Sequence, residues 1–125
     1  MVHSTISSSP LPNLRTLNLC NNYLYRTISQ EIGLLRSFNV LDLSTNNLIG
    51  LIPPPIGNLR NLDTLHLFEN ELSSSIPQKI GLLRSLNVLN LSDNNLIGPI
   101  LPPIGNLRNL ATLHLFENEL SSSIP

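Results

Sequence analysis

The sequence predicts an α/β solenoid: a stack of short coils with a parallel β-sheet on one face and irregular or 3₁₀ turns on the convex side. Three observations predict this fold. Leucines recur every 24 residues, apolar and polar residues alternate over a short stretch of each unit, and Pro and Gly interrupt the segment that follows.

The 24-residue units stay in register along most of the chain. Two of their apolar positions hold Leu14, Phe38, Leu62, Leu86 and Leu110, and Leu17, Leu41, Leu65, Leu89 and Leu113. A second period of 48 residues lies over the first, because residues 38–61 closely match residues 86–109. Stability in such arrays accrues through the interfaces between neighbours, so we expect the units to stack.

Each unit begins L-x-x-L-x-L, and this alternation is typical of a short strand with leucine inside and the intervening side chains outside. An asparagine follows, whose amide can both donate to and accept from the backbone of a turn. We therefore expect a structural asparagine ladder made of Asn22, Asn46, Asn70, Asn94 and Asn118. The return segment I-P-x-x-I-G-x-L predicts an extended or tightly turned path rather than a long helix.

Composition excludes several partners and sites. Seven Lys+Arg against eight Asp+Glu give a net charge of -1, so the chain lacks the field that attracts nucleic acid or an anionic membrane. The lone Cys20 cannot form an internal disulfide, and no cofactor is expected. Neither a signal peptide nor a run of ~18 apolar residues is visible, so we expect no direct membrane insertion from this chain.

The combined pattern L-x-x-L-x-L-x-x-N-x-L and G-x-I-P-x-x-I-G-x-L resembles the leucine-rich repeat of plant receptor-like kinases and receptor-like proteins. The segment NNLIGLIPPPIGNLRNLDTLHL fits it closely, and the resemblance covers about residues 11–125. It implies a curved, right-handed solenoid with the parallel β-sheet on its concave face, extracellular or associated with the plasma membrane, whose inner face or flank recognises a peptide, a steroid or a co-receptor.

The sequence departs from that family pattern at two positions. Arg26, Ser74 and Ser122 replace the Gly of G-x-I-P, and Ser29 and Leu101 replace the Pro, so we expect an imperfect second short strand in those units. Cysteine-pair caps and a kinase domain are also missing. We expect a fragment of an ectodomain or a truncated product, with residues 1–13 as a partial repeat or tail and 14–125 as the repeat domain, its last unit incomplete.

Outward-facing strand positions predict the ligand-binding surface on the concave face, where they form columns. Two columns hold Asn18, Asp42, His66, Asn90 and His114, and Cys20, Ser44, Phe68, Ser92 and Phe116. We expect ligand contacts from Asp42, His66, Phe68, Glu69, Asn90, Asp93, His114, Phe116 and Glu117. Two strand spacings separate the two phenylalanines by roughly 10 Å, which matches residues i and i+3 of an extended peptide. The alternative is that both are surface copies of one ancestral residue.

Other groups of polar residues can be interpreted without catalysis or metal binding. Arg36, Arg60, Arg84 and Arg108 form a basic row before the strands, either a flank for an acidic partner or a solvated ladder. Asp42, His66 and Ser44 could suggest catalysis, but we expect no catalytic residue because no pocket or oxyanion hole is evident. No metal site is expected, since His66 and His114 are two strands apart. Asn90-Leu91-Ser92 is the one candidate glycosylation sequon.

The sequence thus predicts a non-catalytic recognition module for a peptide or protein ligand, a fragment of a plant receptor-like ectodomain that takes part in signalling. The alternative is a secreted inhibitor-like or scaffold protein that docks on a folded enzyme or receptor.

Overall fold

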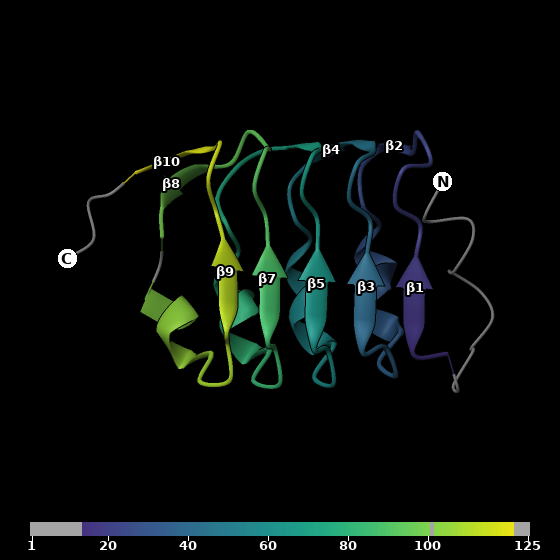
Figure 1. The fold of residues 1–125 in the computed structure, drawn as a ribbon, viewed down its shortest axis with the longest axis vertical. Helices are drawn as coiled ribbons and strands as arrows, with labels where there is room; N and C mark the ends of the chain where they lie inside the picture. The colour runs from purple at the N-terminus through teal and green to yellow at the C-terminus, as the bar shows by residue number, and fades with distance from the viewer. Residues whose placement is uncertain (1–13, 101, 122–125) are drawn as a thin grey trace.

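The computed structural model describes residues 14–100 and 102–121. The predicted tail at 1–13 and the departures at Leu101 and Ser122 therefore lie outside the described residues. Within the described part, the chain is a single stack of coils in which each unit lies beside the next (Figure 1). This arrangement confirms the predicted repeat solenoid.

A five-stranded parallel sheet forms one side of the stack (Figure 1). Its strands, in spatial order, are β1 (Thr16–Asn18), β3 (Val40–Asp42), β5 (Thr64–His66), β7 (Val88–Asn90) and β9 (Thr112–His114). Each residue pairs with the one 24 positions on, as Leu41 pairs with Leu65. The backbone ladder continues past the strand ends, because Thr45 N–H donates to Phe68 O and Glu69 N–H donates to Ser92 O. We call the outward side of this sheet the strand face.

A second set of short strands lies along one end of the coils. β2 (Tyr25–Arg26), β4 (Asn47–Gly50) and β6 (Glu71–Leu72) form one sheet, and β8 (Ile97–Pro99) and β10 (Glu119–Ser121) form another. The division falls between β6 and β8, beside Ser74, where glycine was expected. Two backbone bonds still cross it, from Asn95 N–H to Leu72 O and from Ile97 N–H to Ser74 O. Arg26 does not interrupt the pairing of β2 with β4.

Within residues 14–100 and 102–121, four 3₁₀ helices form the side of the stack opposite the five-stranded sheet (Figure 1). They are η1 (Gln30–Leu34), η2 (Pro54–Asn58), η3 (Gln78–Leu82) and η4 (Pro102–Asn106). Pro53 and Pro77 precede two of them with extended backbone, which positions the turn that follows. Ser29 replaces proline before η1, and its hydroxyl accepts the Glu31 N–H at 3.1 Å. The serine therefore caps the turn that proline starts elsewhere.

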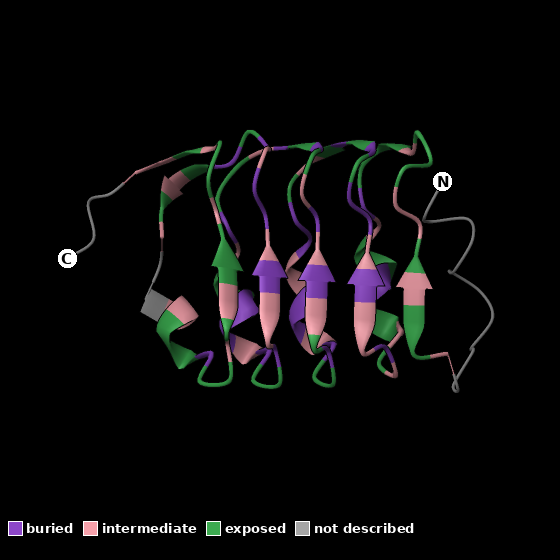
Figure 2. Cartoon of the chain, viewed as in Figure 1, coloured by how far each residue is buried: buried purple, intermediate pink, exposed green. Residues whose placement is uncertain are grey.

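Leucine and isoleucine fill the space between the sheet and the 3₁₀ helices. The central leucines of β3, β5 and β7 are fully buried, whereas Leu113 of the edge strand β9 is 40% exposed (Figure 2). Leu110 and Leu115 are also only partly buried. Neighbouring coils thus supply the burial that one coil cannot provide for itself.

Positive φ angles recur where the second strand turns toward the 3₁₀ helix. Gly50 and Gly98 have φ of 81° and 83°, and Arg26 and Ser74 occupy the same position with φ of 77° and 65°. A residue with a Cβ atom in this region costs roughly 1–2 kcal/mol relative to its preferred conformation. The glycine of G-x-I-P therefore suits the positive φ that this turn requires. The two units with Arg26 and Ser74 adopt the same φ with backbone strain.

Replacing Ser74 with glycine is expected to raise the free energy of unfolding by about 0.5–1 kcal/mol, because relief of the left-handed strain exceeds the added entropy of the unfolded chain. Urea denaturation followed by circular dichroism measures the change. Ser75→Gly is the matched control, since Ser75 has no positive φ and should lose stability. A loss of stability in Ser74→Gly as large as in the control would contradict the strain at Ser74.

Candidate functional site

The strand face brings the predicted column of Asn18, Asp42, His66, Asn90 and His114 together in strict register. Asp42 pairs with His66, His66 with Asn90, and Asn90 with His114, each on adjacent strands of the sheet. His114 is exposed and the other three are half-buried. Because parallel strands lie about 4.8 Å apart, one extended ligand could contact all four side chains.

Two aromatic pairs stand on this face, one in each copy of the 48-residue duplication. The rings of His66 and Phe68 lie 5.4 Å apart at 62°, an edge-to-face contact, and those of His114 and Phe116 lie 5.6 Å apart at 48°. Phe116 is 57% exposed, whereas Phe68 is half-buried. Strand β7 separates the two pairs, so they form two apolar contact points about 10 Å apart.

The predicted column of Cys20, Ser44, Phe68, Ser92 and Phe116 is only partly exposed, which corrects the sequence interpretation. Ser44 and Ser92 are each 2% exposed. The Ser44 hydroxyl donates to Asp42 Oδ1 at 2.6 Å, and the Ser92 hydroxyl donates to Asn90 Oδ1 at 2.7 Å. The same two oxygens also accept the serine backbone N–H groups, at 3.0 and 3.1 Å. These small side chains are held against the strand end by Asp42 and Asn90 and are covered there, whereas Phe68 and Phe116 are more exposed in the same column.

The Asp42, His66 and Ser44 cluster has the geometry of a structural contact. His66 Nδ1 lies 3.5 Å from Asp42 Oδ2, but the buried Ser44 hydroxyl is bonded to the carboxylate and not to the imidazole. A nucleophile needs a base within hydrogen-bond reach and access to substrate. Over residues 14–100 and 102–121, no three His, Cys, Asp or Glu side chains converge in a way that could hold a metal ion.

The acidic column occupies strained backbone. Glu69, Asp93 and Glu117 have φ of 56°, 58° and 57°, and Asn21 and Thr45 share the position with 57° and 56°. Glycine or asparagine would fit this turn with less strain. Glu69 is already held in place, because the Thr45 hydroxyl donates to its Oε1 at 2.7 Å.

Asn90, the sequon residue, lies at the centre of the strand face between His66 and His114. Its Oδ1 is bound by Ser92, while a glycan would be attached through Nδ2. Attachment there would cover the columns beside it. Glycosylation of Asn90 stays a prediction.

The predicted basic row lies on a lateral edge of the stack, in the turns between the 3₁₀ helices and the strands. Arg36, Arg60, Arg84 and Arg108 are all exposed there. This edge is at the start of the strands, whereas the phenylalanines follow the strand ends. The arginines and the aromatic pairs therefore belong to different surfaces.

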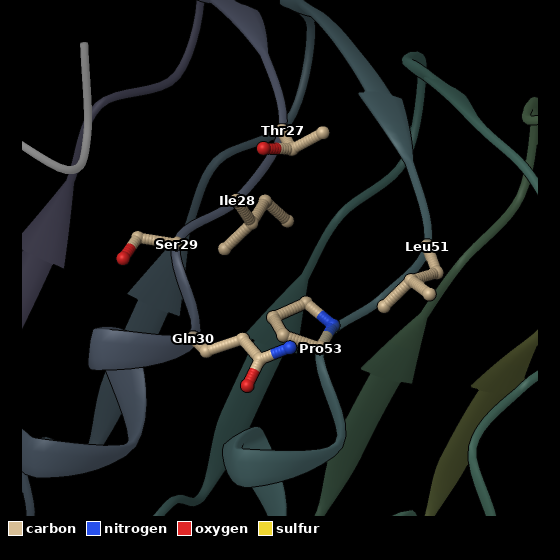
Figure 3. A pocket seen from close by; sticks show the side chains of 6 residues that line it. All are labelled: Thr27, Ile28, Ser29, Gln30, Leu51 and Pro53. Atoms are coloured by element: carbon tan, nitrogen blue, oxygen red, sulfur yellow. The ribbon is translucent and has the colours of Figure 1, made fainter.

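An apolar flank on the second strands was missed by the sequence interpretation. Tyr25, Ile49 and Ile97 are 60%, 47% and 49% exposed on β2, β4 and β8. The signal was available, because Ile49 and Ile97 are copies of one position in the 48-residue duplication. Beside this flank is a shallow pocket of about 230 Å³ between the first two coils. It is lined by Thr27, Ile28, Ser29, Gln30, Leu51 and Pro53 (Figure 3).

Comparison with known families and curated proteins gives one clear match. The family described as Leucine Rich Repeat matches residues 13–35, 37–59 and 85–107, which together make up more than half of the chain. No curated protein matches the sequence.

Solved plant structures share the fold. The leucine-rich repeat ectodomain of the Arabidopsis thaliana receptor kinase GASSHO1/SCHENGEN3, in complex with CASPARIAN STRIP INTEGRITY FACTOR 2, is 40% identical with a TM-score of 0.87; the match covers 90% of this chain and 14% of that one. The Arabidopsis receptor kinase HAESA, in complex with the peptide hormone IDA and the co-receptor SERK1, is 32% identical with a TM-score of 0.73, over 90% of this chain and 23% of that one. A plant ice-binding protein is 34% identical with a TM-score of 0.80, over 88% of this chain and 36% of that one. The chain thus spans a minor part of each of these three proteins.

Proposed function

The chain belongs to the leucine-rich repeat family, and we propose that it is a non-catalytic recognition module whose strand face binds an extended peptide or a segment of a protein ligand. In this proposal it is part of a plant receptor-like ectodomain that perceives a ligand outside the cell, at the plasma membrane. None of the helices in the described part of the chain has the length and hydropathy needed to cross a bilayer.

One observation carries the proposal: the duplicated aromatic pairs His66/Phe68 and His114/Phe116 on one exposed sheet face. Exposed aromatic groups are frequent anchors in protein interfaces. The acidic column of Glu69, Asp93 and Glu117 lies one residue beyond the phenylalanine column. The face therefore fits a ligand that offers apolar side chains about 10 Å apart and a basic group beside them.

The neighbouring structures support this class of ligand without defining it for this chain. HAESA is in complex with a peptide hormone and a co-receptor, whereas another neighbour is an ice-binding protein. The same fold thus serves unrelated ligands, and the side chains of the strand face determine which one binds. A co-receptor that contacts the ligand or the chain's flank is the further partner that we propose.

The absence of catalysis is part of the proposal. Two observations support it. The Ser44 hydroxyl donates to the Asp42 carboxylate and not to the His66 imidazole, and the open sheet does not exclude water from His66.

We expect the full chain to select, from a library of short randomised peptides, extended sequences with apolar residues three apart and a Lys or Arg. Phe116→Ala should weaken binding of a selected peptide by at least tenfold, because it removes an anchor worth at least about 1.4 kcal/mol. Surface plasmon resonance at two salt concentrations measures affinity and the share due to charge.

Ile49→Ala is the matched control, since Ile49 is similarly exposed but lies on the flank. Binding that is equally weakened by both substitutions, or that is unaffected by Phe116→Ala and His66→Ala together, would place the ligand elsewhere.

The exposed flank favours a second function. Tyr25, Ile49 and Ile97 would suit docking on a folded enzyme or receptor, as in a secreted inhibitor-like or scaffold protein. In that case no short peptide would be selected, and Ile49→Ala rather than Phe116→Ala would weaken capture of the folded partner.

A further inference from the structure

A polar pocket lies on the lateral edge of the stack, away from the strand face. It is lined by Arg84, Asn106, Arg108 and Asn109 and has a volume of about 430 Å³. Arg84 lies in the turn that leads into β7, Arg108 and Asn109 lie in the turn that leads into β9, and Asn106 ends η4. An adjoining pocket of about 330 Å³ shares Arg84 and Asn106 and adds Lys79.

The pocket is positively charged and lacks a counter-charge. No carboxylate lines either cavity. Among the residues that the structure describes, neither Arg84 nor Arg108 has an acidic group within ion-pair distance. Both side chains are exposed, so their guanidinium donors remain available.

The two arginines are held side by side by the backbone around them. Asn109 Nδ2 donates to Arg84 O at 3.0 Å and joins the two turns. The Arg108 N–H donates to Asn106 O at 3.0 Å and fixes the local turn. Adjacent coils are about 4.8 Å apart, so the two guanidinium groups can reach one anion. Each guanidinium presents a planar pair of donors that suits bidentate contact with an oxyanion.

The duplication supplies a second copy that differs in a useful way. Arg36, Asn58, Arg60 and Asn61 repeat the same four residues, and Asn61 Nδ2 again points to Arg36 O, at 3.4 Å. In this copy, however, Arg60 Nε donates to Gly57 O at 3.1 Å, so one of its donors is occupied. Asp63 follows Arg60 by three residues, whereas Ala111 holds that position after Arg108. The copy near Arg108 is therefore the better anion site.

We propose that the Arg84–Arg108 pocket binds a doubly charged tetrahedral oxyanion, sulfate or phosphate, either as the free ion or as a monoester on a larger ligand. Two guanidinium groups balance two negative charges, and the Asn106 and Asn109 amides provide further polar contacts. The volume exceeds what a bare ion fills and lies in the range of small-ligand sites. This site is separate from the peptide-binding face, so either proposal can fail without the other.

The test is an NMR titration of the full chain with sodium sulfate and with inorganic phosphate, with chloride adjusted to keep the ionic strength constant. We expect saturable shifts of the amide and guanidinium signals of Arg84, Arg108 and Asn109. Arg84→Gln and Arg108→Gln should each weaken the affinity by roughly tenfold, as expected for the loss of charged hydrogen bonds. Neither substitution alters the backbone carbonyl of residue 84, which accepts the Asn109 Nδ2 hydrogen bond, so the contact between the two turns is kept. Arg36→Gln is the matched control and should leave the affinity within about twofold, well below the loss of one charged hydrogen bond.

Two further titrations, with a sugar phosphate and with sulfotyrosine, distinguish a monoester ligand from the free ion. Tighter binding of a sugar phosphate or sulfotyrosine than of the inorganic ion supports a monoester ligand, and equal binding supports the free ion. Shifts that rise linearly at every arginine, equal effects of Arg36→Gln and Arg84→Gln, or equal binding of acetate would overturn the proposal.

Discussion

Replacing Asn70 with alanine is expected to lower the free energy of unfolding by about 3–5 kcal/mol, since the change removes several hydrogen bonds and leaves a buried donor without a partner. Asn70 is 8% exposed. Its Nδ2 donates to Leu43 O, Leu67 O and Phe68 O at 3.1 to 3.2 Å, and its Oδ1 accepts the Leu48 N–H at 3.0 Å.

The Leu48 N–H carries much of this cost. The carbonyls of Leu43 and Leu67 each receive a second asparagine amide, from Asn46 and Asn94, so they stay partly satisfied in the variant. The Leu48 N–H lies in the buried interior, where water cannot easily replace the lost acceptor. Because Asn70 bonds groups of its own coil and of the preceding one, its loss also weakens the coupling between coils.

Asn22→Ala is the control for this prediction. Asn22 is exposed and its side chain makes one bond, from Nδ2 to Cys20 O at 3.0 Å, so its replacement should cost less than about 1 kcal/mol. Urea denaturation of both variants gives the comparison. Equal losses in the two variants would mean that the ladder does not link buried coils.

Replacing Gly57 with alanine is expected to lower the free energy of unfolding by about 1–3 kcal/mol, because the new methyl group overpacks a tight contact between backbones. A Cβ atom at Gly57 would lie 2.5 Å from Lys79 O in the next 3₁₀ helix. The repeated I-G pair thus sets how closely η2 and η3 approach. Carbonyl oxygen cannot move aside as a flexible side chain would, so the coils must separate.

Gly105 provides the matched control for Gly57. It occupies the equivalent position in η4, but no atom of the residues that the structure describes would lie within 4 Å of a Cβ atom there. Gly105→Ala should therefore be neutral or slightly stabilising, because alanine restricts the unfolded chain. Thermal and urea denaturation of the pair measure the difference. If Gly57→Ala and Gly105→Ala had the same free energy of unfolding, close backbone packing at Gly57 could not explain the regular spacing of the coils.

Much of the architecture follows from local patterns that recur. Leu41 and Leu65 are buried because alternation within a strand assigns one side to the interior, and every coil repeats that assignment. Asn46, Asn70, Asn94 and Asn118 bond the neighbouring coil, as expected of an amide that can donate and accept. His66 and Phe116 lie on the strand face for the same reason as the leucines lie beneath it.

Alternation fails where the strand ends, and there the candidate site needed the structure. Ser44 and Ser92 belong to an outward column by count, yet their hydroxyls bond the Asp42 and Asn90 side chains and both serines are buried. The exposure of Tyr25 and Ile49 depends on how the return segment pairs with the next coil, which the period alone does not describe.

The sequence by itself determined the length of the coil, the leucines of the interior, the asparagine ladder and the strand positions that face outward, because these depend on a period repeated in every unit. Tertiary structure decided which end-of-strand side chains are covered by their neighbours, which glycines permit close packing, and that Arg84 and Arg108 share one pocket. These features depend on contacts between neighbouring coils and on the backbone of the turns, where small differences between repeats change the surroundings of a residue.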